Sequence, residues 1–328
     1  MCGTTGRFDP DPTVLRELLS SLGEVRSLET LNGGLFATAI RVVFADGTRA
    51  VAKIVAADTR RMSTYEHGIL RTEALVFASL AGSGVPVPRV LLTDFTRAGV
   101  DADVVVTEHL PGRVWNDLEL DEDRQRALRR ELGGVMAAAH RVPGPRFGYP
   151  APEAGLAGDT WRKAFGTMVD AVLSDAARWD VTLPAARVEA ALRTHGAAPD
   201  EVVTPATVHA DLWQGNVFVD ESSMHIVGVI DTERTVWADP LLDLVGAEQF
   251  SAEPPDTEIL AGNTAAGGVL NALLETPGGT ARFQLCRMYY ALLLVTEVAV
   301  RGYEGDFATW YETTARANLE AALARLGV

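Results

Sequence analysis

The residue pattern changes at Pro111-Gly112, and no other feature of the sequence constrains the fold as strongly. Before this pair, short runs of β-branched residues follow one another closely; after it, apolar residues recur mainly at helical spacing. A Pro-Gly pair favours a break between elements, because proline lacks an N–H and glycine is conformationally free. The chain has 328 residues, more than one compact core usually holds. The sequence therefore predicts an α+β protein of two lobes, residues 1–110 and residues 111–328.

The segments before the break have the pattern of a small antiparallel sheet with one large helix. A short helix around Val14 opens the chain, and Asp46-Gly47 predicts a tight hairpin between two of the strands. The large helix should cover residues 64–80, and it should end there because glycines and prolines follow it directly. Five strands are expected. The first ends near Leu31, and the other four cover Thr38–Phe44, Arg49–Ala57, Val90–Asp94 and Asp103–Glu108.

The segments after the break predict a mainly helical lobe with one β-rich island, Val202–Asp231. The Pro- and Gly-rich stretch Val142–Gly158 is expected to be a surface loop. Met288–Val300 is the longest apolar stretch, but it is too short to span a bilayer and predicts a buried core helix. The expected helices are Asp121–His140, Asp159–Trp179, Pro184–Arg193, Leu241–Phe250, Thr257–Leu274, Arg282–Arg301 and Phe307–Leu326.

The composition narrows the possible partners. Hydrophobic residues make up 47% of the chain and the net charge is −15, so we expect a folded protein that does not bind nucleic acid. The acidic surface either attracts a cationic small molecule or serves solubility alone. Two cysteines are too few for a disulfide framework, and no secretory signal or membrane span is visible. We therefore expect a cytoplasmic protein without a membrane partner, and the composition leaves the oligomeric state open.

The β-rich island carries the residues with the clearest chemistry. His209, Asp211 and Asn216 lie between two apolar β-prone runs, and Asp231 ends the second run. Phosphoryl transfer from a magnesium–nucleotide needs a carboxylate to accept the hydroxyl proton and oxygen ligands to hold the metal. Asp211 suits the first role, and Asn216 and Asp231 suit the second. Each residue alone could be a turn former or a packing residue, but their order and Asp-x4-Asn spacing favour catalysis.

A lysine in an apolar strand supports the same chemistry. Lys53 lies within Ala50–Ile54, where burying an unpaired ammonium would be costly. We expect Glu73 on the following helix to pair with it, and Glu66 is the second choice. Kinases use such a lysine to contact the nucleotide phosphates. The alternative is a lysine that extends to solvent at a strand edge.

Asn32-Gly33-Gly34 precedes this strand and could bring backbone amides close to phosphate oxygens, or could form a simple turn.

The island resembles the catalytic and metal-binding segments of the aminoglycoside phosphotransferase family, which is related to protein kinases and includes choline kinases. That family carries His-Gly-Asp-Leu-x-x-x-Asn and then Ile-Asp about fifteen residues later. The resemblance implies a protein-kinase-like fold with Asp211 as catalytic base, Asn216 and Asp231 as Mg²⁺ ligands and His209 as support for the loop. Leu35, Phe36, Thr232 and Ala238 depart from the family pattern.

The resemblance also implies a nucleotide site at Val105–Gly112. In relatives the backbone of this hinge binds the adenine edge, which assigns the Glu108 carbonyl and the Leu110 amide here. These are backbone roles, so either ATP or GTP could be the donor. Asp239, followed by Pro240, is expected to cap a helix, and Asp243 is likewise expected to be structural.

The expected activity is phosphorylation of a small-molecule hydroxyl, with an antibiotic such as an aminoglycoside as acceptor. A sugar, an amino sugar or a choline-like alcohol is the metabolic alternative. A protein acceptor is disfavoured, because no Ala-Pro-Glu segment follows Asp231. A catalytically dead nucleotide-binding module is the alternative from another class. The acidic residues expected near a cationic acceptor are Glu233, Glu297, Glu304 and Asp306.

Overall fold

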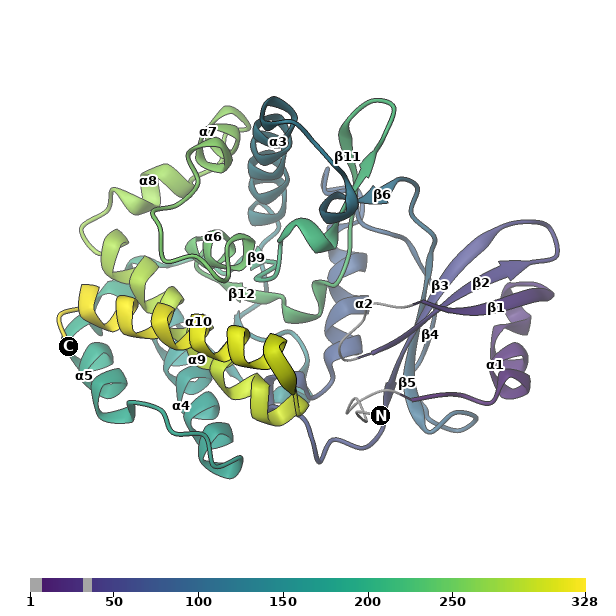
Figure 1. The fold of residues 1–328 in the computed structure, drawn as a ribbon, viewed down its shortest axis with the longest axis horizontal. Coiled ribbons are helices and arrows are strands. Elements are labelled where there is room, and N and C mark those ends of the chain that lie inside the picture. Colours follow the sequence, from purple (N-terminus) through teal and green to yellow (C-terminus); the bar gives the residue numbers. More distant parts are fainter. Residues whose placement is uncertain (1–7, 32–36) are drawn as a thin grey trace.

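The computed structural model describes residues 8–31 and 37–328, and it consists of a sheet-rich part and a larger helical part (Figure 1). The sheet-rich part holds a five-stranded antiparallel sheet in the order β1-β2-β3-β5-β4, with α1 (Pro12–Leu19) and α2 (Ile69–Leu80) beside it. The expected fold class is confirmed. Its strands are β1 (Val25–Leu31), β2 (Thr38–Phe44), β3 (Arg49–Ala56), β4 (Val90–Asp94) and β5 (Ala102–Glu108).

The sheet forms where apolar residues alternate with more exposed ones along a strand and where a strong turn signal joins two strands. In β2 every second residue is buried, as a strand with one face on the core requires. At the β2–β3 turn, the Asp46 carboxylate accepts a hydrogen bond of 2.9 Å from the backbone N–H of Thr48. The resulting register places Lys53 opposite Ala39 and Val105. Lys53 therefore lies on a central strand with neighbours on both sides.

The large helix of the sheet-rich part is shorter than the sequence predicts. Residues 64–66 form a separate 3₁₀ turn, and α2 begins only at Ile69. Gly68 separates them with a φ of 74°, a left-handed conformation that ends helical hydrogen bonding and that glycine adopts without strain. The 3₁₀ turn has its own capping box between Ser63 and Glu66. Glu66 and Glu73 consequently lie on different elements.

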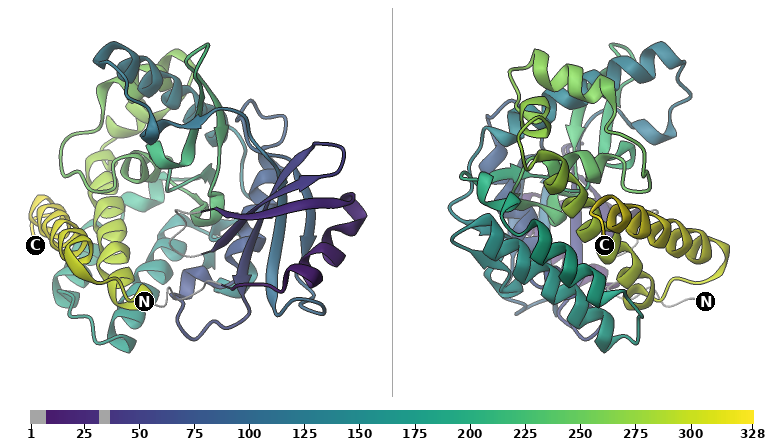
Figure 2. Two further views of the ribbon diagram at one scale, coloured as in Figure 1. Left: turned by 45° about the vertical axis from the view of Figure 1, so that its right-hand side comes forward. Right: turned by 90° about the vertical axis from the view of Figure 1, so that its left-hand side faces the viewer.

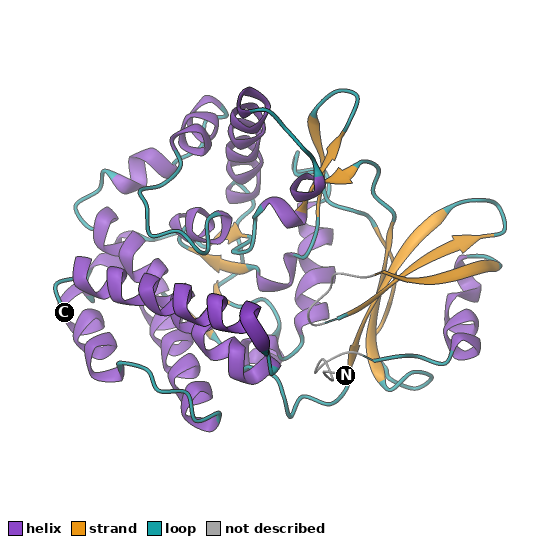
Figure 3. Ribbon diagram, in the orientation of Figure 1, coloured by secondary structure: helices purple, strands orange, loops and turns teal. Residues whose placement is uncertain are grey.

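The helical part also contains two small sheets (Figures 2 and 3), in the orders β11-β10-β6 and β8-β7-β12-β9. Their strands are β6 (Arg113–Val114), β7 (Phe147–Gly148), β8 (Ala157–Gly158), β9 (Ala206–Val208), β10 (Val217–Asp220), β11 (His225–Val229) and β12 (Val236–Ala238). The helices are α3 (Glu122–His140), α4 (Trp161–Arg178), α5 (Ala185–His195), α6 (Leu241–Ala247), α7 (Thr257–Ala265), α8 (Leu270–Leu274), α9 (Gly279–Arg301) and α10 (Gly305–Arg325).

Two expectations for this part are wrong. Residues 257–274 form α7 and α8 instead of one helix, because Gly267 adopts a φ of 74° and ends the first. Residues 142–158 are not a surface loop, since Phe147, Tyr149 and Ala151 are buried. Strands β7 and β8 lie in this segment and pair with each other, which satisfies backbone groups that a buried loop would leave unpaired.

Helix α9 forms the centre of the helical core. It is long and apolar enough to cross a membrane by length and composition, yet 89% of its most apolar window is buried inside the protein. The expectation of a buried core helix is therefore confirmed. Several of its buried residues carry polar or charged groups, among them Tyr290, Glu297 and Arg301. Such groups need partners in the interior, and those partners belong to the site described next.

Candidate active site

The segment that carries Asp211 is held by a buried carboxylate. β9 ends at Val208, and the turn that follows places Ala210 at a φ of 61°. Asp243 of α6 accepts a hydrogen bond of 2.8 Å from the Ala210 N–H, and its other oxygen lies 2.7 Å from Nε2 of His140. Because Asp243 is fully buried, these contacts fix the turn in one conformation. The structural role expected for Asp243 is thus positioning of the loop.

His209 connects this loop to the segment that carries Asp231. Its Nδ1 accepts a 3.3 Å hydrogen bond from the Asp211 N–H, and its Nε2 lies 2.9 Å from the Ile230 carbonyl. The two contacts require a neutral ring with the proton on Nε2. Burial lowers the pKa of His209, which favours the same neutral form. His209 therefore joins the two loops and does not face a reacting atom.

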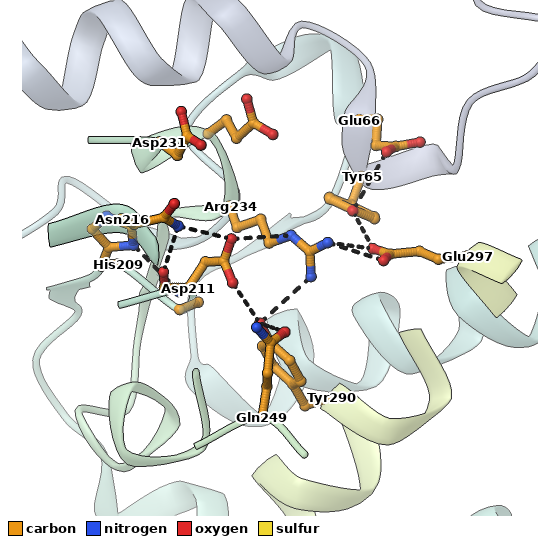
Figure 4. Close-up of polar contacts among 12 residues, drawn as sticks. Tyr65, Glu66, His209, Asp211, Asn216, Asp231, Arg234, Gln249, Tyr290 and Glu297 are labelled. Carbon is orange, nitrogen blue, oxygen red and sulfur yellow. Dashed lines mark hydrogen bonds and ion pairs between the residues drawn. The ribbon is translucent and has the colours of Figure 1, made fainter. Parts of the chain in front are cut away.

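Asp211 lies at the meeting point of three polar side chains (Figure 4). The Asn216 amide donates to the Asp211 main-chain oxygen at 2.8 Å and to its carboxylate at 3.2 Å, and the Tyr290 hydroxyl donates to the other carboxylate oxygen at 3.2 Å. Arg234 Nε lies 3.9 Å from the carboxylate. Burial raises the pKa of Asp211 to about 7 despite the opposing effect of Arg234. A carboxylate with such a pKa is suited to general-base catalysis.

Lys53 lies among three carboxylates, which we call the lysine cluster (Lys53, Glu73, Asp231 and Glu233). Lys53 Nζ is 3.2 Å from Glu73, 2.9 Å from Asp231 and 2.5 Å from Glu233. The Lys53–Glu73 pair expected from the sequence is present. The three carboxylates raise the pKa of Lys53 well above its usual value against the effect of burial, so the lysine remains charged. Glu233, expected near the acceptor, instead pairs with Lys53.

The donor atoms of this region fit a divalent cation such as Mg²⁺. Carboxylate oxygens of Glu73, Asp231 and Glu233 lie within 4.8 Å of one another. Within the described residues, the buried Glu73 Oε2 has no hydrogen-bond partner. The amide nitrogen of Asn216 donates a hydrogen bond to Asp211, and Figure 4 shows the amide oxygen of Asn216 on the side nearer Asp231. Hard oxygen atoms of this kind are the usual ligands of Mg²⁺.

A second charged cluster, which the sequence did not predict, lies on the other side of Asp211. We call it the arginine cluster (Glu66, Arg234, Glu297 and Arg301). Arg234 is 2.9 Å from Glu297, and Arg301 is 2.5 Å from Glu66 and 3.9 Å from Glu297. The hydroxyls of Tyr65 and Tyr311 also donate to Glu297, at 2.6 Å and 3.1 Å. All four charged residues are buried or nearly so.

The arginine cluster changes two expectations. Glu66 does not compete for Lys53, because it pairs with Arg301. Glu297 cannot serve as an exposed acid for a cationic acceptor, because its side chain is 1% exposed and already bound by two arginines. Among the acidic residues suggested for the acceptor, only Glu304 and Asp306 are exposed.

The other expected site residues are backbone positions or structural carboxylates. β5 ends at Glu108, and Leu110 follows it in the connection to β6, so both lie between the two parts of the molecule. Asp239 accepts a 3.1 Å hydrogen bond from the N–H of Leu241, the first residue of α6, and pairs with Arg282 at 2.8 Å. Asn32, Gly33 and Gly34 lie outside the described residues.

Sequence reasoning missed Tyr290, Gln249 and the role of Arg234. Tyr290 lies in the apolar run of α9, where an aromatic residue is typical of a packed core. Its hydroxyl lies 3.2 Å from Asp211, 3.4 Å from Gln249 and 3.5 Å from Arg234. The one sequence signal was the occurrence of glutamate and arginine later in the same apolar helix, which requires buried partners.

Solved structures of similar fold include phosphotransferases. The fold resembles a thermostable mutant of the aminoglycoside phosphotransferase APH(4)-Ia, with a TM-score of 0.65 at 20% identity over 95% of this chain and 99% of that one. It also resembles a putative fructosamine-3-kinase from Thermobifida fusca, with a TM-score of 0.67 at 23% identity over 96% and 100%. A macrolide 2′-phosphotransferase type I matches with a TM-score of 0.59 at 22% identity over 94% and 96%. These identities establish the fold alone.

A family model matches most of the chain directly. The model of the phosphotransferase enzyme family covers residues 27–281, which include Lys53, Glu73, Asp211, Asn216 and Asp231. The matched segment therefore contains the loop that carries Asp211 and the whole lysine cluster. The chain belongs to the phosphotransferase enzyme family.

Proposed function

We propose that this phosphotransferase moves the γ-phosphoryl group of ATP or GTP to a hydroxyl of a small-molecule antibiotic in the cytoplasm. The observation that carries the proposal is the arrangement around Asp211. A carboxylate that is only 15% exposed and has a pKa near 7 lies beside the Asn216 amide, and Asp231 and Lys53 complete the polar surface on one side of it. Phosphoryl transfer depends on positioning and charge stabilisation, and these groups supply both.

The lysine cluster is proposed to hold the nucleotide phosphates. Lys53 would contact phosphate oxygens, and Glu73 keeps the ammonium in place from the buried side. Asn216, Asp231 and Glu233 would hold Mg²⁺, which neutralises charge on the phosphates when it is bound. Structures of the APH(4)-Ia mutant in complex with ADP or AMP-PNP and hygromycin B support a nucleotide donor for this fold.

Asp211 is proposed to accept the proton of the acceptor hydroxyl. The oxygen of that hydroxyl attacks the γ-phosphorus as the bond to the bridging oxygen of the nucleotide breaks, and the diphosphate leaves with the electron pair of that bond. Asn216 and Tyr290 hold one carboxylate oxygen each, which orients the base. His209 acts on the reaction only by positioning the loop.

The acceptor is proposed to be a natural-product antibiotic with an amine. The exposed carboxylates Glu304 and Asp306 and the net charge of −15 favour a cation. Solved proteins of similar fold include an aminoglycoside phosphotransferase and a macrolide phosphotransferase. The fructosamine-3-kinase of the same fold supports a metabolic amino sugar as the second candidate.

The proposal is tested by a screen for phosphoryl transfer. Wild-type protein, ATP or GTP and MgCl₂ are incubated with aminoglycosides, macrolides and amino sugars, and products are analysed by mass spectrometry. We expect an acceptor to gain one phosphoryl group with the wild type and not with Asp211→Ala. Equal product with both proteins would remove Asp211 from the mechanism. Nucleotide binding without transfer to any acceptor would favour a nucleotide-binding module without catalysis.

A further inference from the structure

An aromatic cluster begins beside the base and reaches the protein surface. Gln249 lies 3.4 Å from the Tyr290 hydroxyl, which lies 3.2 Å from Asp211. The next residue along the chain, Phe250, has its ring centroid 4.8 Å from that of Trp310 and 4.9 Å from that of Tyr311. The Tyr311 hydroxyl donates a 3.1 Å hydrogen bond to Glu297, and Glu297 pairs with Arg234 beside Asp211, so the cluster connects to the side chains around Asp211. Figure 4 shows Gln249 and Tyr290 together on one side of the Asp211 carboxylate.

The outer end of this cluster is exposed. Trp310 is 51% exposed and Phe307 is 47% exposed, and their rings lie 6.1 Å apart near the start of α10. Tyr303 packs behind Phe307 at 5.7 Å. Within the described residues, the other exposed large hydrophobic side chains are aliphatic and lie elsewhere in the chain (Leu75, Val203 and Val269). Adjacent exposed aromatic rings are typical of a binding surface.

Carboxylates border the exposed rings. Glu304 and Asp306 are exposed and come just before Phe307, and Glu253 is exposed three residues after Phe250. Aromatic faces attract organic cations through the charge distribution of the ring, and nearby carboxylates strengthen that attraction. An anionic ligand would be repelled. A sugar would cover the rings only with its C–H faces, and so would bury less apolar area than a large apolar ring system.

We propose that Phe250, Phe307 and Trp310 extend the acceptor site and bind the apolar part of an amphipathic amine, while its hydroxyl reaches Asp211. The acceptor class is then an alcohol with a large apolar ring system and a protonated amine, rather than a fully hydrophilic amino sugar. This inference rests on the proposed kinase function. It assigns the exposed aromatic surface to the substrate, because that surface connects to the side chains around the base.

The test compares two acceptors of opposite character. Erythromycin, a macrolide with a dimethylamino sugar, represents the amphipathic class, and hygromycin B represents the polar class. We expect the wild type to phosphorylate erythromycin with the higher kcat/KM. Trp310→Ala and Phe307→Ala should each raise KM for erythromycin by about tenfold or more and leave kcat within about twofold, because they remove ground-state and transition-state contacts equally. Trp310→Phe should restore most of the affinity.

Matched controls separate loss of the site from a general effect. Val269→Ala and Leu75→Ala remove exposed apolar side chains elsewhere and should leave KM unchanged. Affinity for AMP-PNP should be the same in all variants. A preference for hygromycin B, or an unchanged KM for erythromycin in both aromatic variants, would overturn the inference.

Failure of the kinase function itself would give a different result. If the wild type phosphorylates no acceptor, erythromycin binding is measured directly in the presence of AMP-PNP and MgCl₂. Binding that Trp310→Ala weakens still supports the aromatic site, and absence of binding overturns it. Sedimentation analysis tests whether a second copy of the chain covers the rings instead. A dimer that Trp310→Ala converts to a monomer, with erythromycin binding unaltered, would also overturn the inference.

Discussion

The segment Asp231–Arg234 contributes to two charged clusters that differ in charge balance. The lysine cluster has one ammonium for three carboxylates, and its Asp231 side chain is 40% exposed. The arginine cluster has two guanidinium groups for two carboxylates, and its Glu66 and Glu297 are at most 1% exposed. The first cluster has excess negative charge on a surface that a ligand can reach. The second is neutral overall and closed.

This difference indicates which cluster binds ligands. Excess carboxylate beside a partly exposed residue is stabilised by an added cation, and a magnesium–nucleotide supplies one. A balanced buried cluster gains nothing from a further ion, and removal of one member leaves an uncompensated charge. We therefore assign donor binding to the lysine cluster. The arginine cluster joins the 3₁₀ turn that precedes α2 to α9 and supports the side of Asp211 that faces Tyr290.

The largest expected effect concerns Asp211, which lies between the two clusters. Asp211→Asn should lower kcat by about 10² to 10⁴, because the base that accepts the hydroxyl proton is lost. Steady-state kinetics with an acceptor found by the screen measures this change. Nucleotide affinity should remain within about twofold, since the lysine cluster is intact. A variant with wild-type kcat would show that proton acceptance lies elsewhere.

The next effect concerns stability and the arginine cluster. Glu297→Gln should reduce the free energy of unfolding by about 3–5 kcal/mol, because Arg234 loses its closest carboxylate in a buried position. Urea unfolding followed by circular dichroism measures the loss. Glu304→Gln removes an exposed carboxylate and is the matched control, with an expected change of less than about 0.5 kcal/mol. Equal stability of the two variants would contradict a structural role for this cluster.

The pH dependence of activity follows from the pKa of Asp211. Since that pKa is about 7, the carboxylate is ionised above this pH and can act as base. We expect kcat/KM to fall about tenfold for each pH unit below 7 and to level off above it. The pH dependence of stability has the opposite sign. Burial raises the pKa of Asp211 above its unfolded value, so the folded state loses stability as pH rises from about 4 to about 7.

Asp211→Asn removes that titration and tests the sign. Its melting temperature should exceed that of the wild type at pH 8 by more than it does at pH 4, as thermal unfolding at both values would show. A constant difference between the two proteins across this range would mean that Asp211 titrates near its unfolded value.

The smallest expected effect concerns Glu233, which sequence reasoning had assigned to the acceptor. Glu233→Gln should weaken Mg²⁺–nucleotide binding by about tenfold, since it removes one negatively charged carboxylate next to Asp231. Without ligand, stability should be unchanged or slightly higher, because two carboxylates still balance Lys53. Titration calorimetry and thermal unfolding measure the two quantities. Lower stability with unchanged nucleotide affinity would move Glu233 out of the donor site.

The two clusters also differ in how far they could be predicted from the sequence. The Lys53–Glu73 pair was predictable, because an ammonium in an apolar strand needs a carboxylate and the next helix supplies one. The strands were predictable from alternation and from the Asp46-Gly47 turn. Asp211 and Asn216 were recognisable by their spacing, since two residues five positions apart on one short loop must lie close together.

The arginine cluster was not predictable from local pattern. Glu297 and Arg301 are four residues apart on α9, but no periodicity relates them to Glu66 or Arg234, which lie on distant segments. Only tertiary packing brings α9 against the 3₁₀ turn at residues 64–66, where Glu297 reaches Tyr65. For the same reason Tyr290 was indistinguishable from a core aromatic residue. The break at Gly68, which separates Glu66 from α2, was hidden within an otherwise helical pattern.

The central claim is that the open lysine cluster, and not the closed arginine cluster, binds the donor. Titration calorimetry of AMP-PNP with MgCl₂ tests it most directly, in the wild type, Asp231→Asn and Tyr311→Phe. Tyr311→Phe removes a hydroxyl that bonds Glu297 and retains the ring. We predict that binding requires Mg²⁺, weakens by about tenfold or more in Asp231→Asn and stays within about twofold in Tyr311→Phe. Equal weakening in both variants, or wild-type binding that is the same without Mg²⁺, would contradict the claim.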